Sequence, residues 1–160
     1  GALSLNANRH LADYAAFGWP VWPDTLADHP GPLAGFLAGL ARCETPYLAC
    51  VPCDSPLFPP DLVPRLAQAQ SRERAAVAVA CAADAAGVLR RQPVFCLMHR
   101  SVASSLSDFM GAGGRKIGAW LSSVGAISVA FDRPGDAADA FANVNTLAEL
   151  QALEHTHPRS

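Results

Sequence analysis

The strongest constraint on the fold of this chain is the alternation of short apolar runs with segments of helical periodicity. Several of the runs are apolar on both faces, which is typical of strands covered by helices on each side. Such alternation predicts an α/β fold with three layers and a mostly parallel sheet. The predicted strands are Ala2–Leu5, Val21–Trp22, Tyr47–Val51, Ala75–Cys81, Val94–Met98 and Ala126–Phe131.

Helices are predicted between these strands. The last one starts at Thr146, because Glu149 three residues later completes a capping-box spacing. Its leucines, beginning with Leu147 and Leu150, are expected to face a core. No repeat or linker interrupts the pattern, so we expect one domain over residues 1–160. The other predicted helices lie near Leu11–Phe17, Pro32–Ala41, Asp61–Gln70, Ser101–Met110 and Arg115–Val124.

Composition narrows the class of protein. Hydrophobic residues make up 51% of the 160 residues, which is enough to bury a core. No apolar run is long enough to cross a membrane, and no signal peptide is visible. The formal net charge is −2 and no lysine or arginine run occurs, which argues against a nucleic-acid partner.

The five cysteines do not resemble a disulfide framework, because their number is odd and their spacing irregular. Most lie in apolar stretches, which favours reduced, buried thiols in a cytoplasmic protein. Cys50 and Cys53 form a C-x-x-C, but no second ligand pair for zinc is evident and the motif ends a strand instead of starting a helix. We therefore interpret this motif as structural.

Ligands of α/β sheets bind at the carboxyl ends of the strands, so the polar residues that follow strands are the candidates for a site. Asp54 follows the apolar run Tyr47–Val51. A carboxylate held there is a hard oxygen ligand that suits Mg²⁺ bridging nucleotide phosphates. The alternative is an aspartate that accepts backbone N–H bonds in a proline turn.

Two paired-asparagine segments are further candidates. Asn6 and Asn8 follow the first strand, and Asn143 and Asn145 precede the last helix. An i, i+2 spacing on extended chain puts both side chains on one side, where amides can donate to and accept from a base or pterin edge. The alternative is a role in turns and caps. Asp24, after the second strand, joins the candidates for the same reason.

Two glycine-containing loops precede helices and could approach an anion. Gly31 and Pro32 form a helix entry, for which an ordinary structural role is the simpler interpretation. Gly111–Gly114 leads into Arg115 and Lys116, the only lysine. Cations at a helix start oppose the helix dipole, so a phosphate ligand would explain them. The histidines lack partners at ligand spacing, and no P-loop or nucleophile elbow occurs.

Taken together, the ordered segments resemble the MobA-type molybdenum cofactor guanylyltransferases over nearly the whole chain. The fold implied by this resemblance is a Rossmann-like three-layer nucleotidyltransferase fold. The segments that carry it are Asn6–Arg9, Asp24–Gly35, Pro52–Pro56 and Asn143–Thr146, with softer matches at Arg91–Leu97 and Gly114–Ile117.

The resemblance also implies an activity and roles for the candidate residues. The family joins GMP from GTP to molybdenum-molybdopterin and releases pyrophosphate. By position, Asn6 and Asp24 would hold GTP, and Asp54 would bind Mg²⁺ beside the phosphates and act as the catalytic residue. The implied protein partners are molybdopterin-synthesis proteins and molybdoenzyme chaperones, contacted transiently. The residues assigned to the molybdopterin side are Asn143, Asn145, Arg115 and Lys116.

The chain departs from the family at its beginning. The family opens with a strand and a glycine-rich loop that grips the triphosphate, and no segment of the printed sequence matches that unit. Three explanations are open: residues upstream of Gly1, a unit supplied by another chain, or a degenerate relative. We expect the first. A cytidylyltransferase or another nucleotidyltransferase of the superfamily, and a non-catalytic molybdopterin-binding module, remain the alternative functions.

Overall fold

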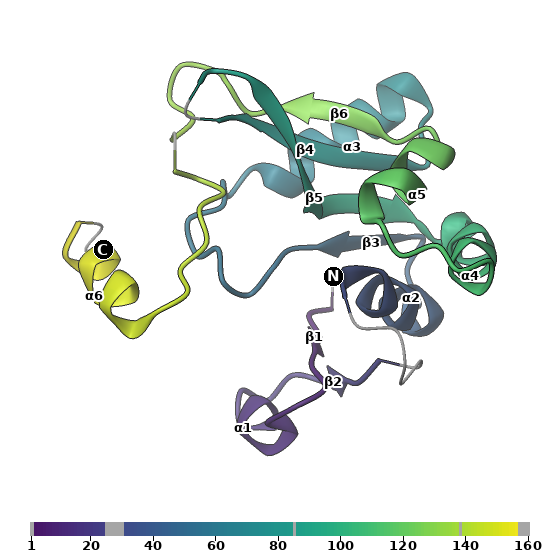
Figure 1. Cartoon of the computed structure of the whole chain (residues 1–160), viewed down its shortest axis with the longest axis horizontal. Coiled ribbons are helices and arrows are strands. Elements are labelled where there is room, and N and C mark those ends of the chain that lie inside the picture. Colours follow the sequence, from purple (N-terminus) through teal and green to yellow (C-terminus); the bar gives the residue numbers. More distant parts are fainter. Residues whose placement is uncertain (1, 25–30, 85, 138, 157–160) are drawn as a thin grey trace.

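A four-stranded sheet with helices on both faces forms the centre of the molecule, and a two-stranded sheet lies below it (Figure 1). The computed structural model describes residues 2–24, 31–84, 86–137 and 139–156. The strands are β1 (Leu5–Asn6), β2 (Val21–Trp22), β3 (Tyr47–Cys50), β4 (Val77–Ala83), β5 (Leu89–His99) and β6 (Ile127–Ala130). The helices are α1 (Leu11–Ala15), α2 (Pro32–Arg42), α3 (Leu62–Glu73), the 3₁₀ helix η1 (Arg100–Val102), α4 (Ala103–Gly111), α5 (Ile117–Ser123) and α6 (Leu147–Thr156).

The larger sheet has the order β3-β5-β4-β6. The strands β3, β4 and β6 point the same way, whereas β5 runs antiparallel to both of its neighbours. Three of the four strands therefore share one direction, as expected for a mostly parallel sheet, and β5 is the antiparallel exception. The reason is local: the Asp84 carboxylate accepts from the backbone N–H groups of Ala86 and Val88, which closes a tight turn and returns the chain beside β4.

The buried side chains form one apolar cluster on each face of this sheet, which confirms the three layers. Helices α2, α4 and α5 cover one face, where Phe36, Leu106 and Trp120 pack together. Helix α3 covers the other face through Leu62 and Leu66. Because strand residues alternate between faces, apolar residues at successive positions of β4 feed both clusters.

The smaller sheet joins β1 and β2 in parallel, and helix α2 contacts both it and the larger sheet. Two glycines of α2 permit these contacts. A Cβ at Gly35 would lie 2.6 Å from Oδ1 of Asn6 in β1, and a Cβ at Gly39 would lie 2.8 Å from the Leu48 side chain in β3. Among the described residues, β1 pairs only with β2 and β3 only with β5, so each keeps one unpaired edge.

A buried arginine ties α3 to the chain that leaves β6. Arg65, whose side chain is 6% exposed, donates to both carboxylate oxygens of Asp136 at 2.8 and 3.1 Å. It also donates to the Ala130 carbonyl at 2.7 Å and covers the Phe131 ring at 3.7 Å. These hydrogen bonds hold the pKa of Asp136 below its ordinary value. The segment after β6 is thus fixed before it crosses toward α6.

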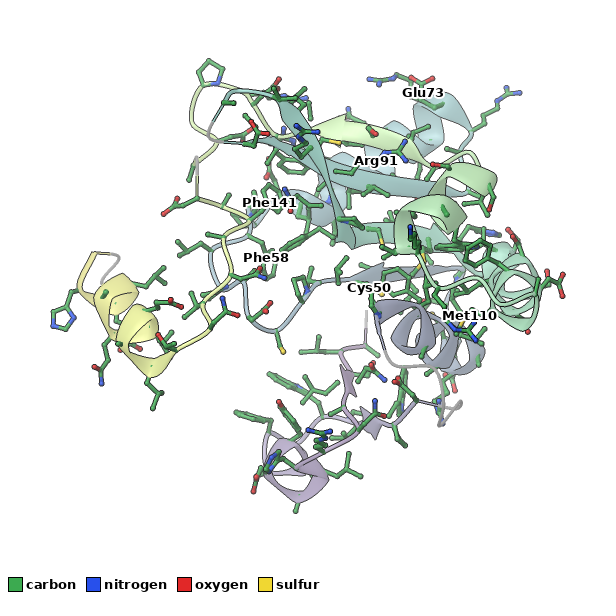
Figure 2. The ribbon with its side chains drawn as sticks, in the orientation of Figure 1. Cys50, Phe58, Glu73, Arg91, Met110 and Phe141 are labelled. Atoms are coloured by element: carbon green, nitrogen blue, oxygen red, sulfur yellow. The ribbon has the colours of Figure 1, made fainter. Side chains whose placement is uncertain are left out.

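That segment crosses the sheet on the side of α3, where the ring centroids of Phe141 and Phe95 lie 4.8 Å apart and Phe58 also contacts Phe95. Figure 2 shows Phe58 and Phe141 near each other on this side. Helix α6 follows, and Figure 1 shows it lying away from the sheet. The predicted capping box is confirmed, because Glu149 and Thr146 exchange hydrogen bonds. The predicted burial of its leucines is wrong for Leu147 and Leu150, which are 77% and 36% exposed, because α6 lies away from the sheet. In the part of the chain that the structure describes, no helix is long and apolar enough to span a membrane.

Candidate functional site

Asp24 and the first asparagine pair form a hydrogen-bonded group at the carboxyl ends of β1 and β2. Asn6 donates to one Asp24 carboxylate oxygen at 3.0 Å and to the Trp22 carbonyl at 2.8 Å. Asn8 donates to the other carboxylate oxygen at 2.7 Å and accepts from the Asp24 backbone N–H at 2.8 Å. The structure therefore brings together three residues predicted from their places after strands, and it fixes the orientation of the Asp24 carboxylate.

The packing of α2 supports this group. Because Gly35 has no side chain, Asn6 can lie against the helix backbone while its amide reaches Asp24. The sequence gives Gly35 no special role beyond its place in the loop-to-helix segment, and the close contact appears only once α2 is packed on β1. Asp28 and Pro30 of the same segment lie outside the described residues.

Asp54 and Asn143 form a second group, although they are far apart in the sequence. The Val144 backbone N–H donates to the Asp54 carbonyl at 2.6 Å. The Ser55 hydroxyl donates to the Asn143 amide oxygen at 2.8 Å, and Ser55 is almost fully buried. The chain after β3 and the chain before α6 are thus joined by two hydrogen bonds. Ser55 is a residue that sequence reasoning does not single out, and its place beside Asp54 is the one signal for it.

The Asp54 carboxylate itself is half-buried, and among the described residues it accepts no hydrogen bond. The interpretation of Asp54 as a turn aspartate, which accepts hydrogen bonds from backbone N–H groups, therefore lacks support. No cluster of three or more potential metal ligands occurs in the described parts of the chain. A single carboxylate at a strand end is enough for Mg²⁺, because this ion keeps several waters and takes substrate phosphates as its other ligands. A metal that is held by protein ligands alone would need more of them.

Arg115 and Lys116 lie apart from Asp54, whereas Asn145 follows Val144, whose backbone N–H binds the Asp54 carbonyl. Arg115 is exposed and donates to the carbonyl of Met110, near the end of α4, and to that of Gly114 in its own loop. Figure 1 places α4 and α5, which flank Arg115 and Lys116, at the right of the sheet, whereas the chain after β3 and the segment before α6 lie at the left. The Asn145 side chain is exposed, and its backbone N–H belongs to the α6 cap. The structure thus brings together Asn6 with Asp24, and Asp54 with Asn143, but not Arg115 or Lys116.

A cavity of about 510 Å³ lies elsewhere, between α3 and β6, with Arg65 and Ser128 among its lining residues. It contains none of the predicted site residues. The candidate site is therefore the open pair of groups at the strand ends. It combines amides, one fixed carboxylate and one unpartnered carboxylate, which suits polar recognition and metal binding better than nucleophilic catalysis.

Comparison with known proteins gives a consistent result. The family described as "MobA-like NTP transferase domain" matches residues 2–126. The chain is 57% identical over 159 residues to the molybdenum cofactor guanylyltransferase of Acidovorax ebreus (strain TPSY), covering 96% of this chain and 75% of that protein. It is 53% identical over 154 residues to the protein of the same name from Bordetella pertussis (strain Tohama I), covering 96% of this chain and 76% of that protein.

The fold has counterparts among solved structures. The crystal structure of molybdopterin-guanine dinucleotide biosynthesis protein A from Archaeoglobus fulgidus superposes with a TM-score of 0.71 at 18% identity. The match covers 96% of this chain and 77% of that one. At this identity the likeness concerns the fold, and it confirms the predicted nucleotidyltransferase-type α/β architecture.

Proposed function

Because the chain belongs to the MobA-like NTP transferase domain family, we propose that it transfers GMP from GTP to molybdenum-molybdopterin. The products are molybdopterin guanine dinucleotide and pyrophosphate. The observation that carries this proposal is the 57% identity, over 96% of the chain, to a molybdenum cofactor guanylyltransferase. The same similarity disfavours the cytidylyltransferase and the non-catalytic carrier. We place this activity in one cytoplasmic nucleotidyltransferase domain over residues 1–160.

The two groups at the strand ends take different substrates in this proposal. Asn6 and Asp24 hold GTP, because the amides of Asn6 and Asn8 leave the Asp24 carboxylate in one orientation. Asp54 holds Mg²⁺ beside the phosphates and is the catalytic residue. Asn143 and Asn145 face molybdopterin, and the link from Ser55 to Asn143 keeps that side next to Asp54. Transient partners would be molybdopterin-synthesis proteins and molybdoenzyme chaperones.

Arg115 and Lys116 complete the proposal as cations for the molybdopterin side. Gly114 allows their loop to pack closely on Phe109, because a Cβ at this position would overlap the Phe109 ring. Since Figure 1 shows α4 and α5 at the other side of the sheet from the chain after β3, the two cations would act on a distant part of the ligand. Charge-reversing Arg115→Glu would then weaken molybdopterin binding without changing GTP binding.

The chemistry requires little of the protein beyond positioning. The attacking group is a phosphate that is already anionic, so no strong general base is needed. When bound, Mg²⁺ supplies charge neutralisation at the transferring phosphoryl group. The chain's own residues hold the guanosine part at Asp24 and the acceptor at Asn143, so that the two anions are aligned. The lack of a histidine or nucleophile among the described site residues is therefore no objection to this activity.

The direct test of this function is a transfer assay with the full chain, Mg²⁺ and molybdenum-molybdopterin. We expect pyrophosphate release and a guanine dinucleotide product with GTP, and far less product with CTP. Equal use of CTP would favour the cytidylyltransferase, and tight pterin binding without pyrophosphate release would favour the carrier. Either result would overturn the proposal.

A Ser55→Ala variant tests the link between the two groups of the site. Losing the hydroxyl removes the hydrogen bond to Asn143, which is worth about 1 kcal/mol. We expect kcat/KM for molybdopterin to fall about fivefold while KM for GTP is unchanged, because only the acceptor side is released. The exposed Ser104→Ala is the matched control. A parallel change in both substrates would argue against a role confined to Asn143.

A Gly35→Ala variant tests the GTP side. The new Cβ would overlap the Asn6 amide and push it aside. Asn6 would then lose its hydrogen bonds to Asp24 and to the Trp22 carbonyl. We expect KM for GTP to rise about tenfold, which corresponds to the loss of one charge-assisted hydrogen bond. The unfolding temperature should be nearly unchanged, because alanine favours a helix more than glycine does. Gly118→Ala, where a Cβ meets nothing within 4 Å, should leave KM unaltered.

A further inference from the structure

Cys50 and Cys96 lie directly opposite each other on neighbouring antiparallel strands. Cys50 ends β3 and Cys96 is its register partner in β5. Directly opposed residues of such a pair project their side chains on the same face. Both thiols accordingly border the apolar cluster beneath α2, and Figure 2 shows Cys50 at the end of β3 beside this helix. Two thiols thus share one place in the sheet.

The two thiols differ in access to solvent. Cys96 is fully buried, whereas Cys50 is half-buried. A hydrogen bond to Cys50, together with burial, raises the pKa of the Cys96 thiol well above its ordinary value. A small oxidant from solvent would therefore meet Cys50 first, with Cys96 in place behind it as the resolving thiol.

The backbone allows the two sulfurs to be joined. Arg100 N–H donates to the Pro46 carbonyl, and hydrogen-bonded pairs recur at every second position of antiparallel strands. Cys50 and Cys96, four positions further along, therefore also form a hydrogen-bonded pair. The Cα atoms of such a pair lie about 5.5 Å apart, inside the range of about 4.4–6.8 Å for disulfides. Their Cβ atoms stand wider apart than a relaxed disulfide requires, so the bond would be strained and easily reduced.

We propose that Cys50 and Cys96 form a reversible oxidation site that converts to an intramolecular disulfide with a hydroperoxide as oxidant. The Cys50 sulfur takes an oxygen from the hydroperoxide, whose O–O bond breaks, giving a sulfenic acid and the corresponding alcohol or water. The Cys96 sulfur then attacks the Cys50 sulfur. The S–O bond breaks, and the hydroxide leaves as water with the Cys96 proton. A dithiol reductant returns both thiols.

The position of Cys50 connects this site to Asp54. Only Val51, Pro52 and Cys53 separate the end of β3 from Asp54. Drawing Cys50 toward β5 would displace the start of this short segment and hence the carboxylate at its end. That consequence rests on the proposed function: the oxidised form binds Mg²⁺–GTP about fivefold or more weakly, a typical size for coupling between sites.

The site is tested by peptide mapping of the full chain after treatment with hydrogen peroxide and alkylation of the remaining thiols. We expect a Cys50–Cys96 cross-linked peptide that dithiothreitol removes. Cys96→Ala should abolish the cross-link and leave Cys50 as a sulfenic acid that dimedone traps. The buried Cys81→Ala is the matched control and should still form the cross-link. If Cys96→Ala does not fold, Cys50→Ser at the half-buried position must prevent the same cross-link.

Absence of the cross-link in the wild-type chain, or a predominant link from Cys50 to the exposed Cys53, would overturn the proposal. Titration of the reduced and oxidised forms with Mg²⁺–GTP distinguishes the coupling to Asp54 from the proposed function. Equal affinity in both forms would overturn the coupling to Asp54. Failure of even the reduced form to bind GTP would instead count against the proposed function, since the disulfide map does not depend on nucleotide.

Discussion

An Asp54→Asn substitution is expected to lower the rate of GMP transfer by on the order of 100-fold, because it removes the one carboxylate proposed to hold Mg²⁺ beside the phosphates. Asparagine preserves the shape of the side chain. The hydrogen bond that joins this loop to Val144 is accepted by the Asp54 backbone carbonyl, so the fold should survive. The measurement is pyrophosphate release at saturating GTP over a range of Mg²⁺ concentrations. Activity of the variant should remain low at every concentration or recover only at high Mg²⁺.

The matched control is Asp108→Asn, which changes an exposed aspartate in α4 by the same atoms. It should retain the activity of the unchanged chain. Circular dichroism melting of both variants checks that folding is intact. Full activity of Asp54→Asn at low Mg²⁺ would remove Asp54 from the mechanism, whatever the family resemblance implies.

An Arg65→Met substitution is expected to cost about 3 kcal/mol of unfolding free energy, the largest effect on stability that we predict. Methionine keeps an apolar side chain on the face of the sheet that α3 covers, but it lacks the positive charge. Among the described residues, the Asp136 carboxylate, whose side chain is 14% exposed, then keeps only the backbone N–H of Arg133 as a hydrogen-bond donor. The Ala130 carbonyl and the Phe131 ring lose their contact as well. Urea unfolding measures the difference.

Arg72→Met on the same helix is the matched control, because Arg72 is 73% exposed and its ion pair in the described part of the chain is with its neighbour Glu73. It should cost less than about 1 kcal/mol, as surface ion pairs do. Equal losses in the two variants would show that the Arg65 pair contributes no more than a surface pair.

The same pair predicts a dependence on pH. Hydrogen bonds from Arg65 hold the pKa of Asp136 below 3.8, so the unfolded state binds its proton first as the pH falls. The contribution of the pair is therefore complete above this pH and is lost as the pH drops toward the folded-state pKa. The unchanged chain should lose stability across this acid range, whereas Arg65→Met should lose less.

The sequence predicts the class of fold and most of its elements well, because periodicity reports directly which faces are buried. Val21–Trp22 forms a strand as predicted, and the helix predicted from Pro32 is α2. The capping residues Thr146 and Glu149 act locally, so their hydrogen bonds could also be predicted. The direction of a strand could not be predicted in the same way, because an apolar run has the same pattern in both directions. The turn at Asp84 that reverses β5 depends on hydrogen bonds to the Asp84 side chain.

The layered α/β architecture and the polar residues that follow its strands can be predicted from spacing over a few residues. Which of these residues lie together depends on contacts between distant parts of the chain. Asn143 binds Ser55 across 88 positions, Arg115 binds the Met110 carbonyl at the end of α4, and Cys50 lies opposite Cys96. Strand register and helix packing act over such long separations, whereas periodicity reports only which faces of a local segment are buried.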